Sequence, residues 1–97
     1  MAGPTWTFLT NHARVLLCLA VEPTLRLREV AERIGITERG AQRIVTDLEE
    51  AGIVSRSREG RRNHYSINPQ QPLRHPHEAQ KTVGDLLLLR DIHKPLE

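Results

Sequence analysis

The strongest constraint on the fold is a change of hydrophobic period near the middle of the chain. Between residues 10 and 51, apolar residues recur every three or four positions, which is the spacing of one helix face. After residue 53 they alternate with polar residues, which is typical of a strand. Gly35 and Gly52 suit the left-handed conformation that ends many helices, and Glu59-Gly60 suits a tight turn. The order is therefore helix, glycine turn, helix, glycine, two-stranded hairpin.

Three helices are expected in the first half of the chain. The first begins at Thr10 or Asn11 and ends before Pro23, which disfavours a helical conformation in the residue ahead of it. The second covers about residues 27–34 and the third about residues 38–51. Their apolar stripes are Ala13, Leu16, Leu17 and Ala20 in the first, Leu27, Val30, Ala31 and Ile34 in the second, and Ala41, Ile44, Val45 and Leu48 in the third.

The second half of the chain adds the hairpin and one more helix. Strands are expected over residues 53–58 and 62–67, with Val54, Tyr65 and Ile67 anchoring them on the helices. A last helix is expected over about residues 77–92. The fold class is thus mainly α with a small β-hairpin. The predicted divisions are an N-terminal extension (1–9), a helical domain with its hairpin (10–68), a proline-rich connection (69–76), a C-terminal helix (77–92) and a tail (93–97), in which Leu96-Glu97 are either native or left by an expression tag.

Charge and composition narrow the class of protein. The chain has 97 residues, which suits one domain, and a formal net charge of +2. Twelve of its 14 basic residues are arginine, which binds phosphates and guanine edges well, although a GC-rich genome produces the same bias. Cys18 is the single cysteine and lies in an apolar run, so a buried thiol is expected and no intramolecular disulfide is possible. No stretch reaches the ~20 apolar residues of a membrane span, and no leader is visible, so a cytoplasmic protein is expected.

The run from Leu27 to Thr37 resembles the helix-turn segment of winged helix-turn-helix transcriptional regulators of the MarR/ArsR type. The similarity continues through residues 48–54, Gly60-Arg61-Arg62 and Tyr65, and covers about two-thirds of the chain. It implies that residues 10–68 form a winged helix-turn-helix domain of a prokaryotic-type regulator. It further implies sequence-specific binding to double-stranded DNA, with the helix at 38–51 in the major groove and the wing at 53–67 on the minor groove or phosphates.

The side chains on the exposed face of the third helix suit base recognition. Arginine pairs with guanine and glutamine with adenine, and each good pair contributes about 1–3 kcal/mol of discrimination. Thr37 can also offer its hydroxyl and the nearby N–H groups to a phosphate. The predicted DNA contacts are Thr37, Glu38, Arg39, Gln42, Arg43 and Thr46 in this helix and Arg56, Arg58, Arg61 and Arg62 in the wing.

Each of these interpretations has a competing one. Arg39 and Arg43 could form the solvated face of an ordinary amphipathic helix, paired with nearby acids. Arg61 and Arg62 could protect an exposed hairpin edge against aggregation. At the level of the whole protein, the alternative is a winged-helix module that binds another protein and makes no direct contact with DNA.

Two residues depart from the usual pattern. Arg26 stands where a Ser or Thr commonly caps the second helix, so the cap is expected from Thr24 or from water. Gly40 lies in the first turn of the third helix, where alanine would contribute about 1 kcal/mol more helix stability. Gly40 either permits a close backbone approach to DNA or to the second helix, or is a tolerated weakness.

The last helix is expected to form a homodimer interface, because its apolar face is wider than a small monomer can readily cover. The predicted interface residues are Trp6, Phe8, Val83, Leu86, Leu87 and Leu89, although Trp6 and Phe8 could instead cover the domain's own core. His75, His77 and His93 could bind zinc only with ligands from a second subunit, and His75 and His77 more readily cap the last helix around Pro76. No metal, cofactor or enzyme constellation is predicted, and no effector site is identified.

Overall fold

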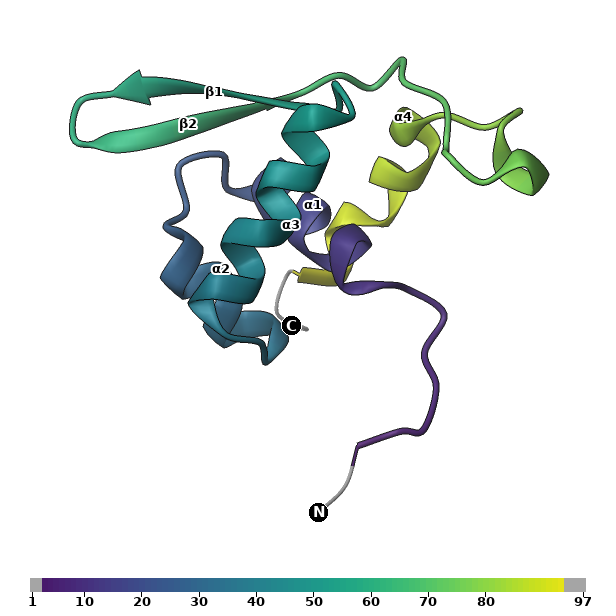
Figure 1. Cartoon of the computed structure of the whole chain (residues 1–97), viewed down its shortest axis with the longest axis horizontal. Helices are drawn as coiled ribbons and strands as arrows, with labels where there is room; N and C mark the ends of the chain where they lie inside the picture. The colour runs from purple at the N-terminus through teal and green to yellow at the C-terminus, as the bar shows by residue number, and fades with distance from the viewer. Residues whose placement is uncertain (1–2, 94–97) are drawn as a thin grey trace.

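The computed structural model describes residues 3–93, and for Ile92 and His93 the backbone alone. It is mainly helical, with one two-stranded antiparallel sheet, which confirms the expected fold class (Figure 1). In chain order the elements are α1 (Asn11–Val21), α2 (Leu27–Ile34), α3 (Glu38–Glu50), β1 (Val54–Glu59), β2 (Arg62–Ile67), the 3-10 helix η1 (Pro76–Glu78), α4 (Val83–Leu86) and the 3-10 helix η2 (Leu87–His93).

The helix ends follow from local hydrogen bonds. The Thr10 hydroxyl accepts a hydrogen bond from Ala13 N at 3.1 Å, which confirms the predicted start of α1. Gly35 ends α2 at φ +79°, a conformation that favours glycine. The cap of α2 differs from the prediction. The Glu29 carboxylate accepts from Arg26 N at 3.1 Å, and Glu29 N donates to Arg26 O at 2.9 Å, whereas the Thr24 hydroxyl makes no hydrogen bond among the described residues.

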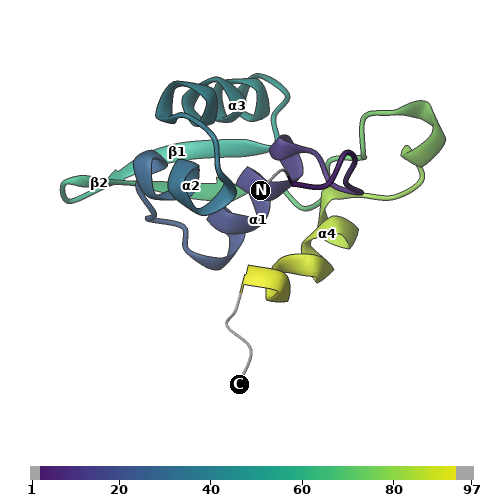
Figure 2. The same ribbon diagram turned by 90° about the horizontal axis from the view of Figure 1, so that it is seen from below.

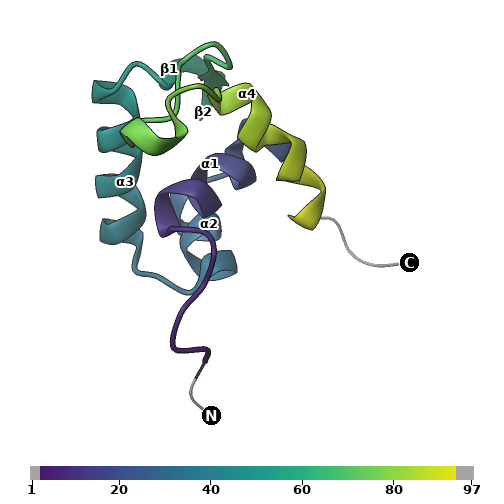
Figure 3. The same ribbon diagram turned by 90° about the vertical axis from the view of Figure 1, so that its right-hand side faces the viewer.

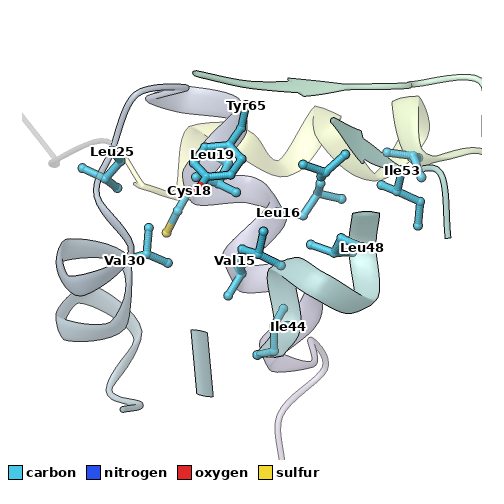
Figure 4. Packing of buried hydrophobic residues seen from close by; sticks show 13 residues of the cluster. Val15, Leu16, Cys18, Leu19, Leu25, Val30, Ile44, Leu48, Ile53 and Tyr65 are labelled. Carbon is cyan, nitrogen blue, oxygen red and sulfur yellow. The ribbon is translucent and has the colours of Figure 1, made fainter. Parts of the chain in front are cut away.

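Helix α1 lies at the centre of the molecule and supplies most of the core. Its residues Val15, Leu17, Cys18 and Leu19 are fully buried. Figure 4 shows this cluster, in which side chains of α2, α3 and the hairpin surround α1. Burial raises the pKa of the Cys18 thiol above its ordinary value, because water no longer solvates the thiolate, as expected for a cysteine that packs as a small apolar residue.

The hairpin projects from the end of α3 beyond the helices (Figure 1). Val54 pairs with Ile67 at its base and Glu59 with Arg62 at its tip, so the loop consists of Gly60 and Arg61, one residue later than predicted. Gly60 has φ +64°, which a type II′ turn requires at its first position. The predicted anchoring of the hairpin is confirmed, since Val54 and Tyr65 are buried.

The C-terminal region does not form the single helix expected over residues 77–92. Backbone hydrogen bonds join Leu73 N to Lys81 O at 2.9 Å and Val83 N to Gln71 O at 2.8 Å, which pair the two ends of a loop that contains η1. A helix through them would lose these bonds, so α4 begins only at Val83, behind a Thr82 cap. Thr82 N donates to the Asp85 carboxylate at 2.8 Å, and this bond lowers the pKa of Asp85.

The C-terminal helical segment packs on α1, on the side opposite α3 (Figure 3). Val83 is only 2% exposed, and Leu86 and Leu87 pack against the same core. Part of the apolar face that was expected to be too wide for a monomer is therefore buried within the monomer, and Val83, predicted at the dimer interface, belongs to this buried part. No helix among residues 3–93 is long and apolar enough to cross a membrane.

Candidate nucleic-acid interface

Helix α3 forms an outer layer of the molecule, with the hairpin and α2 behind it (Figure 2). It buries Ala41, Ile44, Val45 and Leu48 against the core. The opposite face exposes the predicted reading residues Arg39, Gln42, Arg43 and Thr46. Among the described residues 3–93, neither Arg39 nor Arg43 makes an ion pair or a side-chain hydrogen bond. Their guanidinium groups are therefore available to a partner, unlike those of a helix face laced with internal salt bridges.

Gln42 and Thr46 interact with each other on this face. The Gln42 side-chain nitrogen donates to the Thr46 hydroxyl oxygen at 3.4 Å, and that hydroxyl donates to the Gln42 backbone carbonyl at 3.1 Å. The hydroxyl bond fixes Thr46, while the long amide contact is weak. Gln42 therefore keeps its amide oxygen, which makes no hydrogen bond within the described part of the chain, for another donor.

Gly40 lies directly behind the cap of α3. The Thr37 hydroxyl caps the helix by accepting from Gly40 N at 3.0 Å. A Cβ added at Gly40 would lie 3.1 Å from that same oxygen and 3.8 Å from Ile36 Cδ1. The nearest neighbours of a Cβ there are thus the cap of its own helix and the turn before it, and not α2; Ala13 carries a Cβ at the equivalent place behind the Thr10 cap, so the cap does not require glycine. Thr37 and Glu38 remain exposed in front of this first turn.

The four wing arginines have different surroundings. Arg58 and Arg61 are exposed and have no acidic or hydrogen-bonding partner among the described residues. Arg62 donates to the Thr24 carbonyl at 3.3 Å. Arg56 instead forms a two-pronged ion pair with Glu49 in the last turn of α3, with Nη2–Oε1 at 2.7 Å and Nε–Oε2 at 3.3 Å. This hydrogen bonding raises the pKa of Arg56 above its ordinary value.

A small hollow of about 230 Å³ lies between the loop before α2, the start of α3 and the wing. Four arginines line it, against the single acid Glu38: Arg26, Arg58, Arg61 and Arg62. Sequence reasoning missed Arg26, which it treated only as a poor helix cap. No local signal marks Arg26, because its place in this hollow depends on how the hairpin folds back toward α2. The excess of positive charge makes the hollow suited to phosphate oxygens.

Exposed apolar side chains lie away from this charged surface. Trp6 and Phe8 are 68% and 90% exposed, and their rings form an edge-to-face pair with centroids 5.0 Å apart. The alternative in which they cover the domain's own core is therefore wrong. Leu88 and Leu89 on η2 are 74% and 43% exposed. Leu88 was not predicted, because the period of a continuous α-helix places it off the apolar face.

A larger groove of about 540 Å³ separates α1 and the end of α3 from the segment that precedes α4. Its floor is apolar, and its rim includes Asp47, Glu50, Glu78 and Arg74. The His12 ring lies 2.8 Å from the Asp47 carboxylate at this rim. His75 Nδ1 accepts from His77 N at 3.1 Å and caps η1, with Pro76 in its first turn, so His75 caps this short helix and not the last helix, and His77 lies within η1.

Comparison with known proteins gives two findings. The family model of the MarR family matches residues 5–63. The chain is also similar to the crystal structure of a MarR family protein of Mycobacterium tuberculosis in complex with salicylic acid, with a TM-score of 0.53 and 24% sequence identity. That match covers 87% of this chain and 62% of the mycobacterial chain, so this chain spans less than two-thirds of its length. A search of curated proteins finds no match.

Proposed function

The chain belongs to the MarR family of transcription regulators, and on that basis we propose that it binds double-stranded DNA in a sequence-specific manner. The observation that carries this proposal is the unpaired state of Arg39 and Arg43 on the outer face of α3, beside a hollow lined by four arginines. A solvated helix face would not need such a concentration of unneutralised charge.

In the proposed complex, α3 lies in the major groove, which is about 12 Å wide and admits one helix. Arg39 and Arg43 donate to guanine edges, and Gln42 pairs with adenine. Thr37, Glu38 and Thr46 flank these residues on the same helix. The wing meets the minor groove or the adjacent phosphates through Arg58, Arg61 and Arg62, and Arg26 joins them from the start of α2.

Titration of DNA binding with salt tests the proposal. Log affinity for a random duplex should fall linearly with log salt concentration, because each phosphate contact releases counterions. Arg61→Ala should flatten the slope by about one unit, which is the contribution of one lost contact. Arg74→Ala is the matched control, since Arg74 is exposed and belongs to the connection between β2 and α4. Figure 1 shows this connection at the opposite end of the molecule from the hairpin tip.

Two outcomes of the salt titration would contradict this account of DNA binding. A folded protein that fails to bind duplex DNA at about 50 mM salt would contradict the proposal, because phosphate contacts alone support non-specific binding under those conditions. That outcome would favour the protein-interaction module. An equal change of slope in Arg61→Ala and Arg74→Ala would show that net charge, and not the wing, sets the affinity.

We further propose that the protein acts as a homodimer through the exposed apolar residues of η2. Leu88 and Leu89 support this, because they are exposed and adjacent in the chain, and contiguous apolar surface marks sites of protein contact. The segment lies on the far side of α1 from α3, so pairing there leaves both recognition helices free (Figure 3). Two helices about 34–36 Å apart would then read a palindromic site.

Leu88→Glu should therefore convert a dimer to a monomer, because a carboxylate buried at an apolar interface is strongly disfavoured. Gln80→Glu adds the same charge at an exposed position before α4 and should leave the mass unchanged. Sedimentation equilibrium at micromolar concentration measures the mass of both variants in solution. A dimeric Leu88→Glu variant would place the interface elsewhere, and a monomeric wild-type protein would contradict the dimer itself.

A further inference from the structure

The ion pair between Glu49 and Arg56 connects the last turn of α3 to the first half of β1. Both side chains are partly buried, at 29% and 31% exposure, and the two hydrogen bonds between them fix their relative orientation. The Arg56 guanidinium also lies 5.7 Å from the centre of the Tyr65 ring, within range of a cation–π contact. Tyr65 is the cross-strand partner of Arg56 and is buried, so the arginine is held from two sides.

This pair occupies the last point at which the hairpin is tied to α3. Along β1 only Val54 is buried, and every later residue of the strand is exposed. The chain between the helix and the strand turns through Gly52 at φ +73°, and bonds from Ile53 N to Leu48 O at 3.0 Å and from Asn68 N to Ile53 O at 2.8 Å hold it at the base of the hairpin. The angle between α3 and the outer hairpin is therefore set by the base of the hairpin, by the Glu49–Arg56 pair, and by the bonds of β2 to the loop before α2, from Tyr65 N to Pro23 O at 2.9 Å and from Arg62 to Thr24 O at 3.3 Å. Of these, only the Glu49–Arg56 pair joins the hairpin to α3 beyond its base.

The charge of Arg56 is already neutralised by Glu49, and this distinguishes it from the other wing arginines. A DNA phosphate that replaced Glu49 as its partner would exchange one anion for another, with little net gain in charge neutralisation. Arg58 and Arg61 have no anion to give up, and their contacts with phosphate would release counterions in full. Arg56 thus gains less from contact with DNA than its place in a basic hairpin suggests.

We propose that Glu49 and Arg56 are positioning residues, which hold the wing at the angle to α3 that DNA binding requires, and that Arg56 does not itself contact phosphate. This inference rests on the proposed function, since it assigns a role within DNA binding. It predicts that Glu49 favours DNA binding although it is an acid near a polyanion. A phosphate-contacting Arg56 predicts the reverse, because loss of Glu49 would then release a cation for the DNA.

The sign of the effect of Glu49→Gln therefore separates the two roles. If Glu49 positions the wing, this isosteric change weakens affinity for duplex DNA on the order of 3- to 10-fold, the size of ordinary coupling between contacting charged residues. The salt slope stays that of the wild type in Glu49→Gln and in Arg56→Ala, whereas Arg61→Ala flattens it. The exchanged double variant Glu49→Arg/Arg56→Glu restores most of the affinity. Glu50→Gln, one residue along α3 and exposed, is the matched control.

Two results would overturn the assignment: tighter DNA binding by Glu49→Gln, or a slope flattened by about one unit in Arg56→Ala. Amide hydrogen exchange without DNA gives an independent measurement. Glu49→Gln should speed exchange in residues 57–64 and leave α1 unchanged, and unaltered exchange in the hairpin would overturn the positioning role whether or not the protein binds DNA. A wild-type protein that shows no salt-dependent binding, but whose hairpin loosens in Glu49→Gln, would instead contradict the proposed function and leave the wing support standing.

Discussion

Replacing Leu19 by alanine is expected to lower the free energy of unfolding by about 2–5 kcal/mol. Leu19 is fully buried in α1, where the core cluster joins α1 to α2, α3, the hairpin and α4. The substitution removes apolar surface and leaves a cavity that the surrounding helices can fill only in part. Total stability for a domain of this size is about 5–15 kcal/mol, so this single change removes a large share of it.

Urea unfolding followed by far-ultraviolet circular dichroism measures this loss. Tryptophan fluorescence is a poor probe here, because Trp6 is 68% exposed in the folded protein. Gln80→Ala is the control: it shortens a side chain of similar length at an exposed position before α4, and its unfolding free energy should change by less than about 0.5 kcal/mol. Equal losses in the two variants would mean that α1 is not the centre of the core.

Arg43→Ala is expected to have the largest effect on sequence recognition, at about 1–3 kcal/mol of binding free energy for the preferred site. Arg43 lies in the second turn of α3, on its exposed face, and has no acidic partner among the residues that the structure describes. Loss of a bidentate contact with guanine should also relax the preference at one base position, and not only weaken binding overall.

Selection of bound sequences from a randomised duplex pool would define the preferred site, and competition between site variants would measure the relaxed position. Arg74→Ala should leave the preference unchanged, and Arg61→Ala should weaken all sequences about equally, because phosphate contacts carry no base information. If Arg43→Ala weakens every sequence to the same extent, then Arg43 contacts the backbone and another residue of α3 reads the bases.

Local signals predicted most of the fold. The Thr10 and Thr37 caps and the positive φ of Gly35 each arise from bonds within a few residues, and each lies where the sequence placed it. The C-terminal helix was predicted by the same reasoning and was wrong over residues 77–82. There, hydrogen bonds to Gln71 and Leu73 compete with helix formation, and the apolar period gives no sign of those partners.

In the candidate site, too, local sequence patterns place some residues and only the fold places others. The outward face of α3 follows from the period of a helix whose other face is apolar, so Arg39, Gln42 and Arg43 could be placed from the sequence. The wing arginines could not be told apart, since Arg56 and Arg58 lie two residues apart on the same face of the hairpin. Only the fold brings Glu49 to one of them, at 2.7 Å, and leaves the other unpaired.

The sequence by itself determined the order of elements, the ends of the first three helices and the basic character of α3 and the wing. These depend on periodicity and on hydrogen bonds between near neighbours, which any chain with these residues would form. The tertiary structure decided which charges are available, because pairing depends on distances between residues far apart in the chain. It turned Arg56 to Glu49, brought Arg26 beside the wing and buried Val83, since the packing of α1 against α2, α3, β2 and η2 fixes where these segments lie.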